Sequence, residues 1–233
     1  MIPQAVLDFR VKYRASEIPR HYSGLAHFCF ISLVALGVIV FAILRVRRVT
    51  WLELLIVPAT FLLSNYVEYR GHRGPMHHLT RWLGLHFTRH TVQHHQFFTY
   101  DAMSYEGLQD FKIVLFPSVM IFFFLGLQAL PVAVLLYYLV SPNVAHLNLA
   151  TGVSYYLAYE WLHCCYHVRE DSWVSRFPFM QILRRHHTIH HNPALMNRYN
   201  FNTELEEPTP KRRACRITFP ICGWLLGTAY TQP

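Results

Sequence analysis

Histidine is the residue type whose number and spacing in this sequence could support chemistry. The chain contains 16 histidines, and 13 of them lie in two segments, residues 72–95 and 163–191. A neutral imidazole is a good ligand for iron, copper and zinc, so clustered histidines at helical spacing are candidate metal ligands. We expect the isolated His21, His27 and His146 to be ordinary amphipathic side chains.

Two histidine pairs repeat a four-residue step. His163 and His167 are four residues apart, which places both rings on one face of a helix, one turn apart, where they can hold one metal ion. His90 and His94 repeat this step, and His95 lies beside them. These pairs predict metal ligands on two separate helices.

Two further groups fit the same chemistry. His187, His190 and His191 stand at positions i, i+3 and i+4, again on one face of a predicted helix. His72 and His77 are five residues apart, but Gly71 precedes this stretch of chain and Gly74 and Pro75 lie within it. We expect these residues to break the helix and let both rings converge.

The candidate ligands are too many for one ion, because a structural zinc site takes about four. Two ions of about six positions each would use ten nitrogens and leave roughly two positions for water, dioxygen or substrate. Zinc has no redox chemistry, so iron is the expected metal if dioxygen is activated. The ten candidates are His72, His77, His90, His94, His95, His163, His167, His187, His190 and His191.

Two carboxylates could orient these rings. Glu68 lies four residues before His72, and Glu160 lies three residues before His163. Either could accept the outward ring N–H of a ligand and so fix its tautomer. An interfacial carboxylate paired with a nearby arginine is an equally open interpretation of both. The other clustered histidines, His78, His86 and His186, are expected to be spare polar side chains.

Composition indicates a membrane protein that is all-α. The 233 residues are 53% apolar, with a mean hydropathy of +0.19, which is unusual for a soluble chain of this size. The five cysteines show no CxxC spacing, and we predict no disulfide. The apolar blocks predict one membrane domain over residues 1–233 with four transmembrane helices at about 24–44, 51–69, 113–140 and 144–162.

Parity and charge place the histidines on one side of the membrane. Histidines lie before and after the apolar tract 113–162, so they can share a site only after an even number of crossings. With four spans, segments 1–23, 70–112 and 163–233 lie together and carry 18 of the 21 Lys and Arg residues. The positive-inside rule then makes this face cytoplasmic. The excess of basic residues on the cytoplasmic face, which lies near anionic lipid headgroups, accounts for the net charge of +8. No nucleic-acid partner is required to explain it.

Four motifs in this order resemble the fatty acid hydroxylase and sterol desaturase superfamily of histidine-rich membrane di-iron oxygenases. The resemblance runs from about Glu68 to the C-terminus. Its elements are Glu68-Tyr-Arg-Gly-His72-Arg followed by His77, His90-Thr-Val-Gln-His94-His95, His163-Cys-Cys-Tyr-His167 and His187-Thr-Ile-His190-His191. Tyr199-Asn-Phe-Asn-Thr and Gly223-Trp-Leu-Leu-Gly-Thr resemble the segment that closes the family's catalytic cap.

The resemblance implies a fold and a ligand set. It implies four spans, a cytoplasmic helical cap formed by 70–112 and 163–233, and a dimetal centre held by the ten histidines named above. The second element departs from the family pattern, because three residues precede its histidine pair where lipid hydroxylases commonly have two. His86 is therefore the alternative ligand to His90.

The resemblance also implies an activity, namely hydroxylation of a lipid acyl chain by two iron ions with dioxygen as co-substrate. A purified preparation could hold zinc instead. No haem, flavin or nicotinamide motif is visible, so electrons are expected from an external protein, either a cytochrome or a ferredoxin with its reductase. Sterol desaturation or oxidation and carotenoid hydroxylation are the alternatives within the superfamily.

A non-catalytic membrane protein that binds or transports metal is the alternative from another class. A transporter needs polar or ionisable groups along its spans, and the middles of these predicted spans hold almost none. We therefore favour the oxygenase. The expected location is a bacterial inner membrane or an endoplasmic reticulum membrane, crossed several times.

Overall fold

The computed structural model describes residues 2–192 and Ile221. In that part of the chain the regular structure is helical and contains no β-strand beyond an isolated bridge between Thr99 and Ala102. The all-α prediction is confirmed to this extent. The chain forms two compact units: a histidine unit of residues 1–24, 65–114 and 162 onward, and an apolar unit of residues 25–64 and 115–161.

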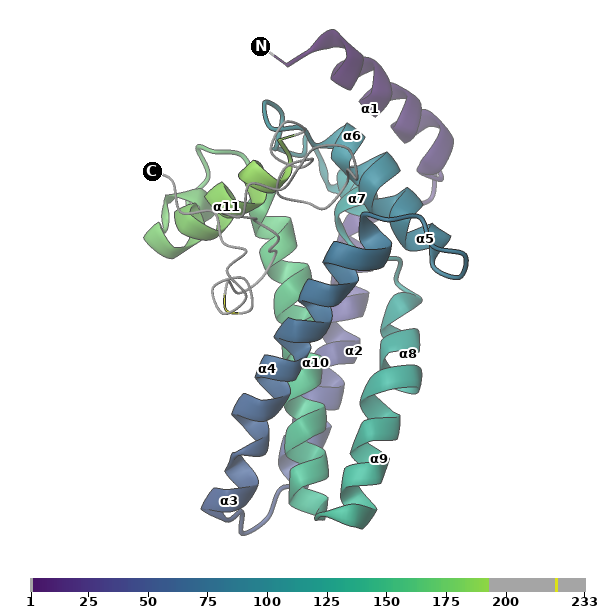
Figure 1. The fold of residues 1–233 in the computed structure, drawn as a ribbon. Helices are drawn as coiled ribbons and strands as arrows, with labels where there is room; N and C mark the ends of the chain where they lie inside the picture. Colours follow the sequence, from purple (N-terminus) through teal and green to yellow (C-terminus); the bar gives the residue numbers. More distant parts are fainter. Residues whose placement is uncertain (1, 193–220, 222–233) are drawn as a thin grey trace, which may run out of the picture. The chain divides into compact units, whose positions relative to one another are not determined.

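The apolar unit is built from helices (Figure 1). They are α2 (Gly24–Arg45), α3 (Trp51–Leu54), α4 (Ile56–Gly71), α8 (Met120–Phe124), the π-helix η4 (Leu125–Ala129), α9 (Leu130–Leu139) and α10 (Pro142–Tyr166). The last residues of α4 and α10 belong to the histidine unit. The helices therefore carry the chain directly into the segments that bear the histidines.

Helix α10 contacts the other long helices of the apolar unit. Trp161 Nε1 donates to Ser32 Oγ of α2 at 3.0 Å, and Asn148 Nδ2 donates to Thr60 Oγ1 of α4 at 2.8 Å. The Tyr156 ring stacks on a phenylalanine of α8, with ring centroids 4.9 Å apart. Buried polar groups in an apolar interior need such partners, so these bonds fix how α2 and α4 pack on α10.

The two turns of the apolar unit are tied together. Asn143 Nδ2 donates to the carbonyl of Arg47 at 2.9 Å, and Arg47 N donates back to Asn143 Oδ1 at 3.0 Å. Glu53 caps the start of α3 with Thr50 and accepts from Ser141 Oγ at 2.6 Å. The turn before α3 and the turn before α10 therefore lie at the same end of this unit.

The helix bounds agree with three predicted spans and differ from the fourth. Helix α2 covers 24–44, α3 and α4 cover 51–69 with one non-helical residue between them, and α10 extends past both ends of 144–162. The predicted span at 113–140 begins too early, because the helix starts only at Met120. Pro117 lies in the intervening stretch, and proline lacks the N–H that continues a helix.

Among the residues that the structure describes, two helices are long and apolar enough to cross a membrane, judged by length and composition. They are Gly24–Arg45 and the continuous stretch Met120–Leu139. Both carry large apolar side chains that remain exposed, including Leu33 at 69% and Leu127 at 76%. Exposed apolar surface of this kind is typical of lipid contact, so these helices support membrane association.

The histidine unit consists of short helices together with the ends of α4 and α10. They are α1 (Gln4–Glu17), the π-helix η1 (His72–Met76), α5 (Gly84–Phe87), the π-helix η2 (Thr88–His94), α6 (His95–Phe97), the 3₁₀-helix η3 (Leu108–Asp110), α7 (Phe111–Val114), the 3₁₀-helix η5 (Val174–Arg176) and α11 (Pro178–His190). Helix α1 packs on α6 through Tyr13, whose ring meets that of Phe97 edge-on, with centroids 5.6 Å apart.

Gly24 provides a test of packing at the start of α2. A Cβ added there would overlap the carbonyl oxygen of Leu108, whereas a Cβ at Gly37 of the same helix would meet nothing within 4 Å. We predict that Gly24→Ala lowers stability by about 1–3 kcal/mol, because the backbone at Leu108 must move. Gly37→Ala should be neutral or slightly stabilising. Thermal unfolding in detergent checks both, and equal effects would contradict the close contact.

Candidate metal centre

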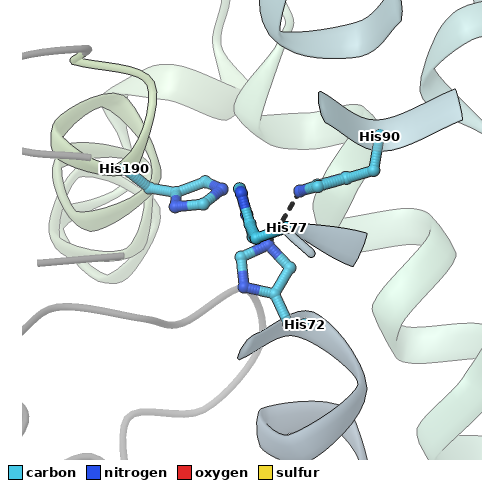
Figure 2. A group of neighbouring side chains, drawn as sticks. All are labelled: His72, His77, His90 and His190. Carbon is cyan, nitrogen blue, oxygen red and sulfur yellow. Dashed lines mark hydrogen bonds between the residues drawn. The ribbon is translucent and has the colours of Figure 1, made fainter. Parts of the chain in front are cut away.

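One group of histidines converges where η1, η2 and α11 meet. We call His72, His77, His90, His190 and His95 the first cluster. The first four offer ring nitrogens that all lie within 4.8 Å of one another (Figure 2). His72 Nε2 lies 2.9 Å from His90 Nε2, and His95 Nε2 lies 3.2 Å from the same His90 atom. All five side chains are buried.

A second group converges on the end of α10. We call His94, His163, His167, His187 and His191 the second cluster, and the ring nitrogens of its first four members also lie within 4.8 Å of one another. His163 Nε2 is 3.2 Å from His94 Nε2, and His187 Nε2 is 3.0 Å from His167 Nε2 and 3.1 Å from His191 Nε2. These five side chains are buried as well.

All ten predicted ligands therefore come together in two clusters, but their division differs from the spacing argument. His163 and His167 share a cluster, as expected. His90 and His94 do not, although their rings stack at 5.4 Å. His90 and His94 lie in the π-helix η2, whose hydrogen bonds join residues five apart rather than four, as from His95 N to His90 O. His90 and His95 therefore share a face and a cluster, whereas His94 reaches the other cluster.

The fourth motif is also divided between the two clusters. His187 and His191 belong to the second cluster, whereas His190 belongs to the first. Between His72 and His77 the predicted helix break is replaced by the π-helix η1, which continues from α4. The wider turn still brings the two rings together, with centroids 4.8 Å apart. π-Helical turns are frequent at functional sites.

Hydrogen bonds fix the tautomers in the second cluster. Nδ1 of His167 lies 2.7 Å from the carbonyl of Met103, and Nδ1 of His191 lies 2.7 Å from the carbonyl of Phe98. A carbonyl only accepts, so each Nδ1 must carry the proton and each Nε2 must be a bare lone pair in the neutral ring. Both lone pairs point at His187 Nε2, and one N–H cannot be aimed at both. A cation among these rings would resolve the conflict.

The spacing of the nitrogens also fits a shared ion. Two ligands at about 2.1 Å from one ion and at right angles to each other are about 3 Å apart. The five tightest contacts between ring nitrogens in the clusters are between 2.9 and 3.2 Å. Neither tetrad contains a carboxylate or a cysteine. The donor set therefore suits a transition metal such as iron or zinc rather than calcium or magnesium.

Burial keeps the imidazoles neutral, as metal ligands must be. Burial lowers the pKa of His77 and of His163 to about 3, with neighbouring histidines adding to the effect. The pKa of His191 is lowered by burial to about 4, against the opposing effect of its hydrogen bond to Phe98. The pKa values of His94 and His167 are also lowered by burial and by neighbouring rings.

The atoms that orient the second cluster are main-chain carbonyls. Besides the Met103 and Phe98 carbonyls, the carbonyl of Ile113 lies 3.2 Å from His94 Nδ1. In the first cluster, Thr91 Oγ1 donates to Met76 O at 2.6 Å and lies 3.3 Å from His77 Nδ1. Sequence reasoning missed these groups, because every residue carries a carbonyl and no residue type marks the ones that are used.

Of the two carboxylates predicted to orient the rings, Glu160 has hydrogen-bond partners in the apolar unit. Glu160 accepts from Phe116 N at 3.3 Å and from Tyr156 Oη at 3.0 Å, both within the apolar unit. The acceptors for His94, His167 and His191 are carbonyls rather than Glu160. Glu68 is half-buried near the end of α4, and its orienting role stays a prediction.

The sequence predictions that remain concern three clustered histidines and two C-terminal segments. His78, His86 and His186 are half-buried and belong to neither tetrad, so His90 rather than His86 lies in the first cluster. The segments Tyr199–Thr203 and Gly223–Thr228, compared above with a catalytic cap, lie outside the described residues. Comparisons with protein-family models, with curated proteins and with solved structures found no match.

Metal analysis tests the two clusters. We predict that the purified chain binds two transition-metal ions, one for each cluster, and that His77→Ala and His163→Ala each remove one of them. His21→Ala, an exposed histidine outside both clusters, should keep both. Elemental analysis of protein freed from loosely bound metal gives the stoichiometry. A chain that keeps two ions after either cluster substitution would contradict the assignment.

Acid should unfold the metal-free chain. Each buried histidine has a lower pKa in the folded than in the unfolded state, so between pH about 6.5 and about 3 the unfolded chain binds more protons. Stability is therefore full above pH about 6.5 and falls as the pH drops, by about 1.4 kcal/mol per pH unit for each histidine. Denaturation of chelator-treated protein from pH 8 to 4 measures this. A flat profile would show that the rings are not buried.

Proposed function

We propose that this chain is a membrane oxygenase that hydroxylates a lipid acyl chain, using two iron ions held by the two histidine clusters. The observation that supports it most is the proximity of two all-histidine clusters. His95 of the first cluster stacks on His191 of the second at 4.3 Å, and His90 stacks on His94 at 5.4 Å. Two ions held there would be close enough to act on one dioxygen molecule.

The reaction needs a redox metal and an external source of electrons. When bound, a pair of iron ions supplies dioxygen activation. One oxygen atom enters a C–H bond of the acyl chain, and the other leaves as water after taking up two electrons and two protons. The electrons come from a separate cytochrome, or from a ferredoxin with its reductase.

The chain's own residues contribute position and exclusion of water. Ten buried imidazoles supply neutral ligands, and the carbonyls of Phe98, Met103 and Ile113 hold three of them in one tautomer. Five nitrogens per ion leave about one of six positions open for dioxygen or water at each. A structural site would use all its positions, so this count favours catalysis.

The proposed membrane topology has four spans with the histidines at the cytoplasmic face. Two of the helices meet the length and composition expected of spans, and the four-span arrangement extends this to α4 and α10. His94 precedes the 113–162 tract and His163 follows it, and their Nε2 atoms lie 3.2 Å apart. This contact supports an even number of crossings between them, and the charge bias supports a cytoplasmic site. An acyl chain could then enter from the bilayer.

Lipid analysis tests the activity. We predict that cells expressing the chain accumulate a lipid whose acyl chain carries one added oxygen atom, and that this atom is isotopically heavy when cells grow under labelled dioxygen. The double variant His163→Ala and His167→Ala should make none, because the second cluster loses two ligands. Mass spectrometry of total lipids measures both results.

The matched control is His21→Ala, which should give the same product as the unaltered chain. Oxygen appearing in a sterol or carotenoid would redirect the substrate class and keep the dimetal chemistry. A purified chain that binds two ions, consumes no dioxygen with any of these lipids and leaves cellular lipids unchanged would contradict the oxygenase and indicate a metal-binding protein.

A further inference from the structure

We propose that Arg10 of the N-terminal helix α1 is a positioning residue for the second cluster, acting through the loop that follows α6. This inference rests on the dimetal centre proposed above. Arg10 is far from every histidine motif in the sequence, yet its side chain is 1% exposed. A buried guanidinium is costly unless its N–H groups and charge are matched, and here they are matched by one loop.

Arg10 binds two carbonyls of this loop and one carboxylate. Its Nε donates to Phe97 O at 2.9 Å, its Nη2 donates to Ala102 O at 2.6 Å, and its Nη1 donates to Glu106 Oε1 at 2.8 Å. The guanidinium also lies over the Phe97 ring, 5.0 Å from its centroid. Arg10 therefore holds the loop at three points that are spread along its length.

Each carbonyl that Arg10 holds is followed along the chain by a carbonyl that orients a histidine. Phe98 O follows Phe97 O and accepts from His191 Nδ1 at 2.7 Å. Met103 O follows Ala102 O and accepts from His167 Nδ1, also at 2.7 Å. Successive carbonyls of an extended chain point in opposite directions, and Phe98 has extended torsions of φ −110 and ψ 114. At Phe98, then, the loop has the guanidinium on one side and the imidazole on the other.

Other contacts make this loop a stiff link. Ala102 N donates to Thr99 O at 2.9 Å, which closes the turn between the two carbonyl pairs. The Phe98 ring stacks on His167 with centroids 4.0 Å apart. Arg14, one turn along α1, forms a two-point bond with the buried Asp110 at the far end of the loop, at 2.8 Å for both contacts. A shift of Arg10 would therefore move the carbonyls that aim His167 and His191.

The effect should be confined to one metal. The two histidines oriented by the loop that Arg10 holds, His167 and His191, both belong to the second cluster. In the first cluster the group beside His77 Nδ1 is the Thr91 hydroxyl, which α1 does not hold. We therefore expect loss of Arg10 to weaken the ion of the second cluster and to leave that of the first.

Zinc titration against a chelator tests this inference, with Zn²⁺ as the probe and no activity needed. In Arg10→Gln we expect one of the two zinc ions to be held about 10 to 100 times more weakly, the usual effect of removing a group that orients ligands. Arg10→Lys keeps the charge beside Glu106 and should recover part of the affinity. It also carries the comparison if Arg10→Gln fails to fold. Arg169→Gln, which alters an exposed arginine paired with Asp171, should change nothing.

Double variants identify which ion is affected. In a His163→Ala background, where the second cluster is already disabled, Arg10→Gln should cause no further loss of zinc. In a His77→Ala background it should weaken the one remaining ion. Equal weakening of both ions, or an unchanged affinity for both, overturns the inference. A chain with two zinc ions but no hydroxylated lipid leaves it standing, whereas a chain with none removes the dimetal centre as well.

Discussion

The structure depends on the burial of imidazole lone pairs that face one another. Imidazole nitrogens of the two clusters approach one another, in the tightest contacts to between 2.9 and 3.2 Å, and in the second cluster the carbonyl partners leave bare lone pairs aimed at a single atom. Neutral rings repel in this arrangement unless a cation lies between them. Burial lowers their pKa values, so protons do not take that place near neutral pH. The two clusters of this unit therefore have the geometry to hold metal ions.

The rest of the histidine unit can be understood as support for this arrangement. Helix ends supply the ligands: α4 leads into His72, α10 carries His163 and leads into His167, and α11 carries His187 and His190. The loop between α6 and α7 supplies the carbonyls, and α1 holds that loop through Arg10. Coupling of metal binding to folding would then run through main-chain groups that any residue could provide.

Sequence reasoning succeeded where periodicity determines geometry. The apolar block after Gly24 gave the bounds of α2 closely, and the spacing of His163 and His167 correctly placed both in one cluster. It failed where the spacing along one helix does not determine which residues of other elements lie beside each ring. His90 and His94 share a helix but belong to different clusters. Pro117 was a visible signal that the predicted span at 113 began too early. Arg10 entered only the count of basic residues in segment 1–23, because no periodicity distinguishes a buried arginine from an exposed one.

Anomalous X-ray scattering from crystals of the purified, metal-loaded chain tests the central claim most directly. Data collected on either side of the metal absorption edge locate the ions without reference to any assumed site. The account requires two anomalous peaks, one enclosed by the rings of His72, His77 and His90 and the other by those of His94, His163 and His187. A single peak elsewhere, or rings that turn away from one another with no metal between them, would contradict it.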